Sequence, residues 1–588
     1  MEFSILADSF DKMESTRKRL ELTQYLVELF ERTPHEVISK IVYLLQGKLR
    51  PDFEGIELGV AEKLAMRAIS KSSGMPIKKI EEEYRKGGDL GHAASTILEQ
   101  KTQTTFLVED ITVERVYETL FKIAKLGGTR SQDMKMKYIS SLLNDATPLE
   151  ASFILKILLG TLRLGIAENT VMDALAVAFS GNKDNRKILE YAYNVSSDLG
   201  KVAETVAVKG MAGIKEFEIV LFNPIRPMLA DRIKNEEDAV EKMGNSFAAE
   251  YKLDGERVQL HVEGEKVVLF SRSLENISNY YPDIIERIPK AIHAENVILE
   301  AEAVAINENT AEFLPFQELM HRRRKYKIEK AVTQYPITVN FFDILYCNGK
   351  NCLELDYKDR RKMLEKIVKE DEFAKHIPMA IISNENEIED FLENSINAGS
   401  EGLMLKMLDK PYTTGSRGSH WLKLKREYQN DLGDSLDLVV IGGFFGKGRR
   451  TGSYGTLLLA TYDEDDDVFT SICKVGTGFS DESLDQLYQI LHPKVTIKKN
   501  PRIVSEMEAD VWFEPELVIE VVASEITLSP IHKAARDKIR KDAGLALRFP
   551  KFTGKIRVEK TCEDASTNEE VITLYKGQKK VAHDKNLV

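Results

Sequence analysis

Cysteine is scarce in this sequence, with only four residues among 588. They are Cys347, Cys352, Cys473 and Cys562, and no two of them form a Cys-x-x-Cys pair. The chain therefore lacks both the spacing of a zinc cluster and the density of a disulfide framework. We expect the four side chains to be ordinary buried thiols.

Long apolar runs are also missing. The first residues, MEFSILADSFDKMESTRKRLE, place charges where a secretory signal needs an apolar stretch. No run approaches the roughly 18 to 20 apolar residues that span a bilayer. These absences predict a cytoplasmic protein without a membrane partner.

The chain has no excess of positive charge, since 82 Lys and Arg residues stand against 94 Asp and Glu residues and the net charge is −12. This balance excludes a protein that coats DNA through bulk charge, so any contact with nucleic acid needs local basic surfaces. The 43% hydrophobic and 30% charged content is that of a folded globular chain. At roughly 150 residues per domain, the length predicts about three or four domains.

The first domain is predicted to be all α-helical and to span residues 1–218. Apolar residues recur there at helical spacing, and two segments combine a Thr N-cap, Pro at the first helical position and Glu at the third. They are Thr33–Glu36 and Thr147–Glu150. We expect a helix to start at each.

The second domain, residues 219–430, is predicted to be α+β. Arg257–Val262 alternates apolar and polar residues, passes through Glu263–Glu265 and runs into another apolar strand, which is a hairpin pattern. Helices are expected around residues 358–369 and 387–398.

The third domain, residues 431–588, is predicted to be a small β-barrel. Strands at Leu438–Ile441 and Leu457–Tyr462 flank a glycine-rich and basic loop, 442–450, and one helix is expected at Asp481–Leu491. Short strands, glycine-rich turns and an inserted helix suit a partly open barrel of the oligonucleotide-binding (OB) fold. The acidic stretch Asp463–Asp467 is expected to be a solvated hairpin loop.

A candidate nucleophile, Lys252, stands just before an Asp-Gly turn in the segment Glu250–Arg257, which reads EYKLDGER. Taken alone, a Lys-x-Asp-Gly sequence is more often a surface lysine at a hairpin. Further motifs follow it in a fixed order: Ser271–Asn276, Leu299–Glu302, Phe341–Tyr346, Glu401–Lys406 and Trp421–Lys425. Their order and spacing resemble the nucleotidyltransferase motifs of ATP-dependent DNA ligases, with a close match to the archaeal and eukaryotic replicative type.

The chemistry that the resemblance implies explains the residue types. An amine attacks the α-phosphate of ATP only when it is neutral, so a site of this kind needs burial and neighbouring positive charge around Lys252. Lys406, Lys423 and Lys425 can supply that charge and can neutralise phosphate charge during the displacement. AMP on Lys252 would then pass to a DNA 5′-phosphate, and attack by the 3′-hydroxyl would seal the nick and release AMP.

The resemblance also implies roles for other residues. Glu250 and Phe342 would contact adenine, with the Phe342 ring stacked on the base, although a phenylalanine in an apolar strand is by itself more often a core residue. Arg257 and Arg272 would bind sugar or phosphate. Glu302 and Glu401 would hold ribose or a divalent metal, with Mg²⁺ (or Mn²⁺) suited to one or two carboxylates plus water and phosphate oxygens.

Two further arginines complete the implied nucleotide contacts. Arg417, in the segment Tyr412–Arg417, resembles a further nucleotide contact, and Arg548 would orient the leaving pyrophosphate when the third domain closes over ATP. The chain departs from the family pattern at Lys551, where arginine is common, and at Glu300–Ala301, where Asp-Gly is common. Both departures keep the charge pattern.

The partner expected from the resemblance is nicked double-stranded DNA, gripped through backbone and minor groove by the helical domain without base readout. The basic run 321–327 is either a phosphate contact or a solvated face. Gln103–Leu107 stands where archaeal relatives carry a sliding-clamp motif, but an ordinary loop explains it equally well. A monomer is expected.

Three alternatives remain open from the sequence. An RNA ligase or a capping guanylyltransferase shares the chemistry, but the long helical region before Lys252 favours a DNA ligase. A catalytically silent DNA or clamp scaffold would keep the fold, although the full set of lysines, arginines and glutamates argues against it. An NAD-dependent ligase is disfavoured because no four-cysteine zinc element is present.

Overall fold

The computed structural model describes residues 1–577 except 101–109, 129, 234, 245, 307–312, 314–315, 321, 323–330, 333–334, 426–434, 447–452, 497, 524 and 549. The chain divides into two compact units, Met1–Lys423 and Leu424–Val588. In the described part of the chain, none of the helices has the length and apolar character needed to traverse a lipid bilayer.

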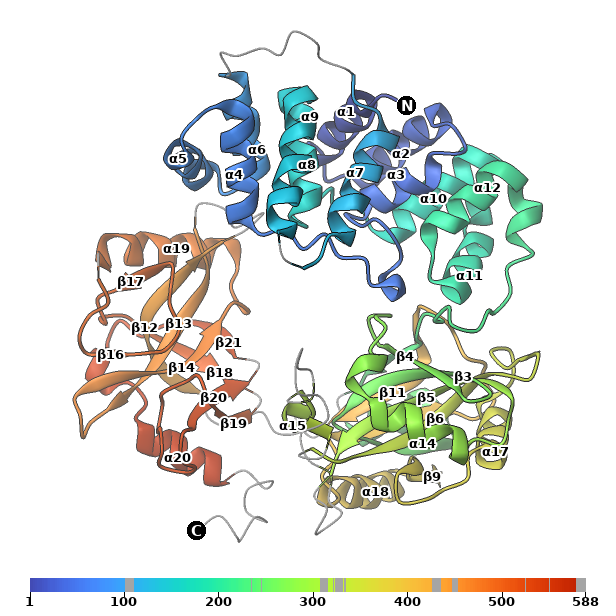
Figure 1. Ribbon diagram of the computed structural model, residues 1–588. Helices are drawn as coiled ribbons and strands as arrows, with labels where there is room; N and C mark the ends of the chain where they lie inside the picture. The colour runs from blue at the N-terminus through green and yellow to red at the C-terminus, as the bar shows by residue number, and fades with distance from the viewer. Residues whose placement is uncertain are drawn as a thin grey trace. The chain divides into compact units, whose positions relative to one another are not determined.

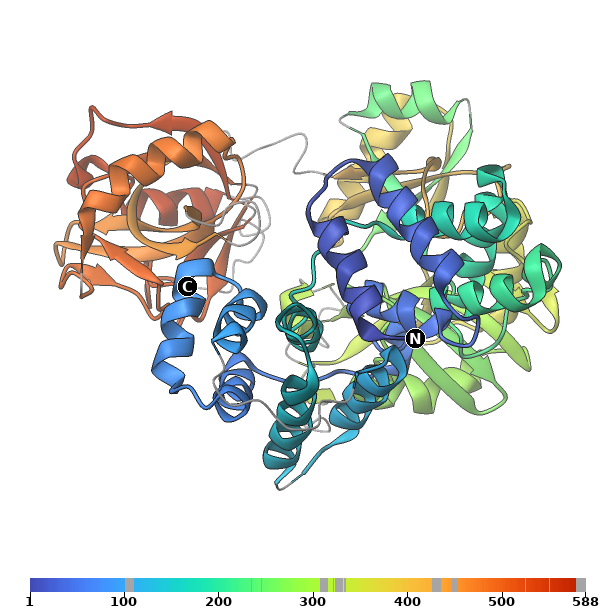
Figure 2. The ribbon, with the colours of Figure 1, turned by 90° about the horizontal axis from the view of Figure 1, so that it is seen from above.

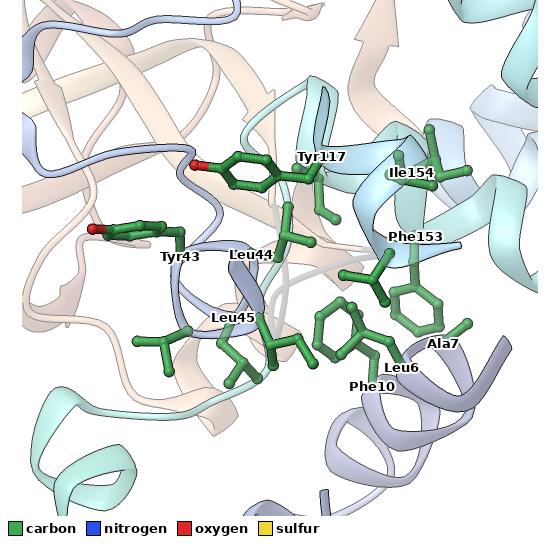
Figure 3. Close-up of a cluster of buried hydrophobic side chains, with 14 of the residues drawn as sticks. Leu6, Ala7, Phe10, Tyr43, Leu44, Leu45, Tyr117, Phe153 and Ile154 are labelled. Atoms are coloured by element: carbon green, nitrogen blue, oxygen red, sulfur yellow. The ribbon is translucent and has the colours of Figure 1, made fainter. Parts of the chain in front are cut away.

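The first part of the first unit is helical, as the sequence predicts (Figure 1). It packs around one apolar core, in which α1 lies against α9: the Phe10 and Phe153 rings meet edge to face with centroids 5.3 Å apart (Figure 3). Such pairs add about 0.5–1.5 kcal/mol beyond burial. The helices are α1 (Phe3–Glu14), α2 (Arg19–Arg32), α3 (Ile38–Leu45), α4 (Glu62–Ser73), α5 (Ile77–Gly87), α6 (Leu90–Glu99), α7 (Val113–Lys125), α8 (Ser131–Asp145), α9 (Pro148–Leu158), α10 (Glu168–Ser180), α11 (Arg186–Ser196) and α12 (Leu199–Ile214).

The two expected helix starts have different outcomes. Thr147 caps α9 in a complete capping box with Glu150, which confirms that prediction. The prediction at Thr33 was wrong, because α3 begins only at Ile38 and the Thr33 hydroxyl donates back to the Leu29 carbonyl of α2 at 2.7 Å. The same Thr-Pro-x-Glu sequence therefore ends one helix and begins another, depending on which backbone groups need partners.

The rest of the first unit contains two β-sheets with helices. One has the order β1-β11-β10-β2-β9, and α18 (Glu385–Asn397) packs on it. The other has the order β4-β3-β5-β6-β7, with β8 beside β6, and α14 (Pro282–Ala291) and α17 (Tyr357–Ile367) pack on it. The strands are β1 (Leu229–Arg232), β2 (Phe247–Lys252), β3 (Glu256–Glu263), β4 (Lys266–Ser271), β5 (Asn296–Ala305), β6 (Ile337–Cys347), β7 (Lys350–Asn351), β8 (Ala374–His376), β9 (Met379–Ile382), β10 (Gly402–Met407) and β11 (Arg417–Lys425), with short helices α13 (Glu236–Met243) and α15 (Phe316–Met320).

The expected β3–β4 hairpin and both helices of this region are confirmed. The turn between β2 and β3 requires glycine, because a Cβ on Gly255 would lie 2.3 Å from the carbonyl oxygen of Ala303. This close approach packs the turn that follows Lys252 against β5.

The second unit is mostly β-sheet, and Figure 2 shows its orange helix, α19 (Asp481–Leu491), lying across the strands. α19 has the predicted bounds, and residues 464–467 form the expected turn between β13 and β14. The main sheet has the order β15-β17-β12-β13-β14-β16, with β18 pairing β12 and β21. The elements are β12 (Leu436–Phe445), β13 (Tyr454–Asp463), β14 (Val468–Val475), β15 (Val495–Thr496), β16 (Ile503–Val504), β17 (Val511–Phe513), β18 (Val518–Val522), β19 (Glu525–Ser529), β20 (Gly544–Arg548), β21 (Lys551–Ile556) and α20 (Asn568–Gly577).

One detail of this unit differs from the sequence prediction. Residues 442–445, expected in a loop, belong to β12, and 447–450 lie outside the described residues. The pairings among the described strands do not close into a ring. In its described residues the unit is β-rich with the two α-helices α19 and α20, and the partly open barrel stays a prediction.

Candidate active site

Strand β2 carries Glu250 and Lys252, which are two positions apart and so lie on the same face of the sheet. Strand β10 runs antiparallel beside it, and the Glu401 amide donates to the Lys252 carbonyl at 2.8 Å. This pairing brings the Glu401 carboxylate to 2.6 Å from the Lys252 ammonium. Both side chains are about one-fifth exposed, so the lysine is reachable from solvent while held in one orientation.

Glu302 on β5 is the third charged group at this position. Burial raises its pKa to about 7, and the negative charges of Glu401 and Asp254 act in the same direction. Lys252 and Arg257 oppose the shift. An acidic group with such a pKa exchanges its proton near neutral pH, which is common at functional sites.

These carboxylates fit a divalent cation that takes only part of its ligands from the protein. In the described residues no group of three or more His, Cys, Asp or Glu side chains could hold a metal ion by itself. Mg²⁺ accepts one or two carboxylates and fills its remaining positions with water and phosphate oxygens. The donor set of Glu302 and Glu401 therefore suits Mg²⁺ that arrives with a nucleotide.

Lys406, on β10, lies in a cage of aromatic rings. Its ammonium is 4.7 Å from the Phe342 ring centroid, 4.9 Å from that of Tyr357 and 4.3 Å from that of Trp421. It pairs with Glu250 at 2.6 Å, and both side chains are 1% exposed. Burial lowers the pKa of Lys406, and Glu250 opposes this shift.

Glu250 is thus held from several sides. Besides Lys406, the Tyr357 hydroxyl donates to it, and the Arg361 guanidinium lies 3.7 Å away. A buried carboxylate with this many donors has a fixed orientation. Phe342, on β6, is 7% exposed, and its ring lies against the ammonium of Lys406 that pairs with Glu250.

Arg257, on β3, is bound to Glu300 rather than open to solvent. Its Nη2 donates to both carboxylate oxygens of Glu300, at 2.8 and 2.7 Å, and to the Tyr412 hydroxyl at 3.1 Å, while Nη1 donates to the Met228 carbonyl at 2.8 Å. Burial by itself would lower the pKa of Arg257, but the charge of Glu300 outweighs burial. The pKa of Arg257 therefore lies above its usual value. Its Nε is buried and has no hydrogen-bond partner among the described residues.

The remaining expected contact residues lie on β11, just after β4 and on β20. Lys423 and Lys425 of β11 share a half-buried face, while Leu422 and Leu424 are buried. Arg272 is exposed just after β4, and the exposed Arg417 lies 4.0 Å from Asp231. Arg548, on β20, donates to the Thr527 hydroxyl at 2.8 Å.

The structure adds no support for DNA or clamp contact at two expected contact segments. In the basic run 321–327, the one described residue, Arg322, is 1% exposed and pairs with Asp283 at 2.8 Å, so it belongs to the core rather than to a basic surface. The other residues of that run, and Gln103–Leu107, lie outside the described residues.

Sequence reasoning missed several residues that contact the predicted site residues Glu250, Arg257 and Lys406. Tyr357 and Arg361 belong to α17, where an amphipathic helix explains them fully. Glu300 and Trp421 lie inside quoted motifs without an assigned role. Only the alternation of β5, which places Glu300 and Glu302 on one face, could have identified Glu300.

Comparison with known proteins agrees with this arrangement. Three family descriptions match the chain: "DNA ligase N terminus" over residues 2–176, "ATP dependent DNA ligase domain" over 227–425 and "ATP dependent DNA ligase C terminal region" over 450–560. The site and the order of its domains define a multidomain nucleotidyltransferase of the ligase class.

Individual relatives cover the whole length. A DNA ligase of Nitrosopumilus maritimus (strain SCM1) is 88% identical over 588 residues and covers 100% of both chains. A DNA ligase of Cenarchaeum symbiosum (strain A) is 70% identical over 99% of both chains. The solved structure titled "Pmar-Lig_Pre." has a similar fold, with a TM-score of 0.56 at 17% identity, covering 94% of this chain and 98% of that one. This chain belongs to the ATP-dependent DNA ligase family.

Proposed function

We propose that this DNA ligase seals nicks in duplex DNA through an AMP group carried on Lys252. The observation that carries the proposal is that Lys252 pairs with Glu401 beside Glu302 and lies on the same strand as Glu250, which pairs with the buried Lys406. The high identity to DNA ligases over the full length supports the same activity.

The reaction proceeds in three displacements at phosphorus. The Lys252 Nζ attacks the α-phosphate of ATP, a phosphorus–nitrogen bond forms and pyrophosphate leaves. A DNA 5′-phosphate oxygen then attacks the lysine-bound AMP and releases the lysine. The 3′-hydroxyl finally attacks that activated 5′-phosphate, forming the phosphodiester bond and releasing AMP.

Glu250 and Phe342 are proposed to receive the adenine, with Lys406 holding Glu250 rather than a phosphate. Arg257, Arg272 and Arg417 are proposed contacts to sugar or phosphate, and Lys423 and Lys425 are proposed to neutralise charge on the α-phosphate. Arg548 is proposed to orient pyrophosphate. Glu302 and Glu401 would hold Mg²⁺ or Mn²⁺, which would supply Lewis-acid neutralisation of the phosphate oxygens.

Further features belong to this proposal. We predict the domain bounds 1–218, 219–430 and 431–588 and a partly open OB barrel in the last domain. We also predict a monomeric state, a cytoplasmic location and a sliding-clamp contact through Gln103–Leu107. Nicked duplex DNA is the proposed substrate, gripped by the helical region.

The decisive experiment incubates the full chain with labelled ATP and magnesium and maps the adduct by mass spectrometry. We expect one AMP on Lys252, and Lys252→Ala should lose both adduct and nick sealing. The substitution Lys18→Ala, at the exposed residue just before α2, serves as a control. An adduct elsewhere, labelling by GTP alone or equal sealing by wild type and Lys252→Ala would overturn the proposal.

A further inference from the structure

The segment Tyr412–Arg417, here called the nucleotide loop, contacts the helical region directly. Asn194 of α11 is 7% exposed, and its Nδ2 donates to the carbonyl oxygen of Thr414 at 2.9 Å. Gly415 has φ of +66°, and a Cβ there would lie 2.3 Å from the Asn194 Oδ1. The loop therefore fits against Asn194 so closely that only glycine is accommodated at its bend.

The segment that joins the helical region to β1 extends this contact. The Arg226 amide donates to the Asn194 carbonyl at 2.8 Å, and the Gly415 amide donates to the Arg226 carbonyl at 3.1 Å. The Leu229 amide then donates to the Ser416 carbonyl at 3.0 Å. Asn194 thus contacts the nucleotide loop twice, once through its side chain and once through Arg226.

Arg226 itself is anchored on two helices of the helical region. Its Nη2 pairs with Glu168 of α10 at 2.7 Å, and its Nη1 donates to the Tyr193 hydroxyl of α11 at 2.6 Å. That hydroxyl donates to Glu168 at 2.6 Å, so the three side chains all contact one another. A charge-assisted network of this kind resists displacement better than a single contact.

The other end of the loop reaches the proposed nucleotide contacts. The Tyr412 hydroxyl accepts from the Met228 amide at 2.8 Å and donates to Glu300 at 2.9 Å. Glu300 is the carboxylate that holds Arg257. A shift of the nucleotide loop would therefore move both Arg417 and the group that orients Arg257.

We propose that Asn194 is a positioning residue for ATP, through which the helical region holds the nucleotide loop in its binding geometry before any DNA is present. The inference rests on the proposed transfer of AMP to Lys252. It gives the helical region a role in the first chemical step, beyond its expected grip on DNA. Asn194 is not among the residues proposed to contact ATP, so its effect is on binding geometry and appears mainly in the ATP concentration that half-saturates adenylation.

The test measures adenylation of the full chain without DNA over a range of ATP concentrations. Asn194→Ala should raise the half-saturating ATP concentration roughly tenfold, as expected for loss of one ordering hydrogen bond at a site, while the rate at saturating ATP falls less. Gly415→Ala should have the same effect, because its Cβ displaces the loop. The double variant should be no worse than the more impaired single variant, because both changes act on one contact.

Two controls separate this role from a general loss of structure. Asn185→Ala removes a hydrogen bond to Ser180 in the turn before α11, without contact to the loop, and should keep wild-type half-saturation. Binding of Asn194→Ala to a nicked duplex that lacks the 3′-hydroxyl should stay as in wild type. Folding of each variant is checked by its thermal transition.

The outcomes are distinct. A folded Asn194→Ala protein with wild-type ATP half-saturation would overturn the inference, and so would an equal loss of adenylation and DNA binding. If Asn194→Ala does not fold, Gly415→Ala is combined with the milder Asn194→Asp. Additive increases in the half-saturating ATP concentration would then overturn the inference. Absence of any adduct on wild-type Lys252 would instead overturn the proposed function, which keeps the two failures apart.

Discussion

The Lys252 ammonium and the Glu401 carboxylate lie 2.6 Å apart. The proposed nucleophile is therefore paired to a carboxylate that is also a proposed ligand of the metal. A divalent cation that binds Glu401 would compete with this ion pair and release the amine toward the phosphate.

Glu401→Gln should therefore raise the magnesium concentration that half-saturates adenylation by roughly tenfold, within the usual range for groups that support a metal. Adenylation rates measured across a magnesium titration give this value. Glu393→Gln, at an exposed position on α18, should leave it unchanged. An unaltered magnesium requirement in Glu401→Gln would remove Glu401 from the metal site.

Glu250→Gln should weaken the preference for ATP over GTP. A carboxylate accepts a hydrogen bond from the adenine amino group and repels the guanine carbonyl, whereas the Gln amide can donate to that carbonyl. We expect the ratio of kcat/KM values for adenylation and guanylylation to fall by roughly tenfold or more. If the ratio stays at its wild-type value, another group selects the base.

The buried pair of Arg360 and Asp343 is expected to matter for stability. The Arg360 Nε and Nη2 lie 2.7 and 3.0 Å from the Asp343 carboxylate, and both side chains are fully buried. Asp343→Ala should lower the free energy of unfolding by about 3–5 kcal/mol, because it strands a buried charge. Denaturant unfolding measures the loss.

The double substitution Arg360→Met with Asp343→Leu supplies the control for this pair. It removes both charges and should cost less than Asp343→Ala alone. Glu21→Ala, which breaks the exposed pair with Lys18, should change stability little. A double variant less stable than the single one would show that the pair itself contributes net stability.

His261 should make the protein less stable in acid. Burial lowers its pKa to about 3, and its Nδ1 accepts from the Phe222 amide at 2.9 Å, so the neutral ring is the form that fits. Because the folded pKa lies below the unfolded value, this contribution is fully present above about pH 6.5 and is lost as pH falls toward 3. From about pH 7.5 to about pH 5 we expect a loss of about 2 kcal/mol.

Urea unfolding at several pH values measures this slope. His261→Gln, which cannot take up a proton but keeps an acceptor for the amide, should be less stable at neutral pH and should lose the part of the slope that His261 causes. An identical slope in both proteins would assign the acid sensitivity to other groups.

Much of the local structure follows from the sequence because short-range chemistry determines it. The capping box at Thr147, the hairpin of β3 and β4 and the bounds of α19 depend on neighbouring residues alone. The Lys-x-Asp-Gly turn and the ordered motifs likewise select Lys252 and Glu250 as candidate site residues from the sequence alone. The Thr33 prediction failed because its hydroxyl found a partner in the preceding helix.

Only the tertiary structure decides the partners of the charged groups. Antiparallel pairing of β2 with β10 brings Glu401 to Lys252 and Lys406 to Glu250 across about 150 residues of sequence. No local pattern links Asn194 to Thr414, since that contact exists only when a helix of one region packs on a loop of another. Residue types and their order thus come from the sequence, whereas distances, burial and shifted pKa values arise from long-range packing.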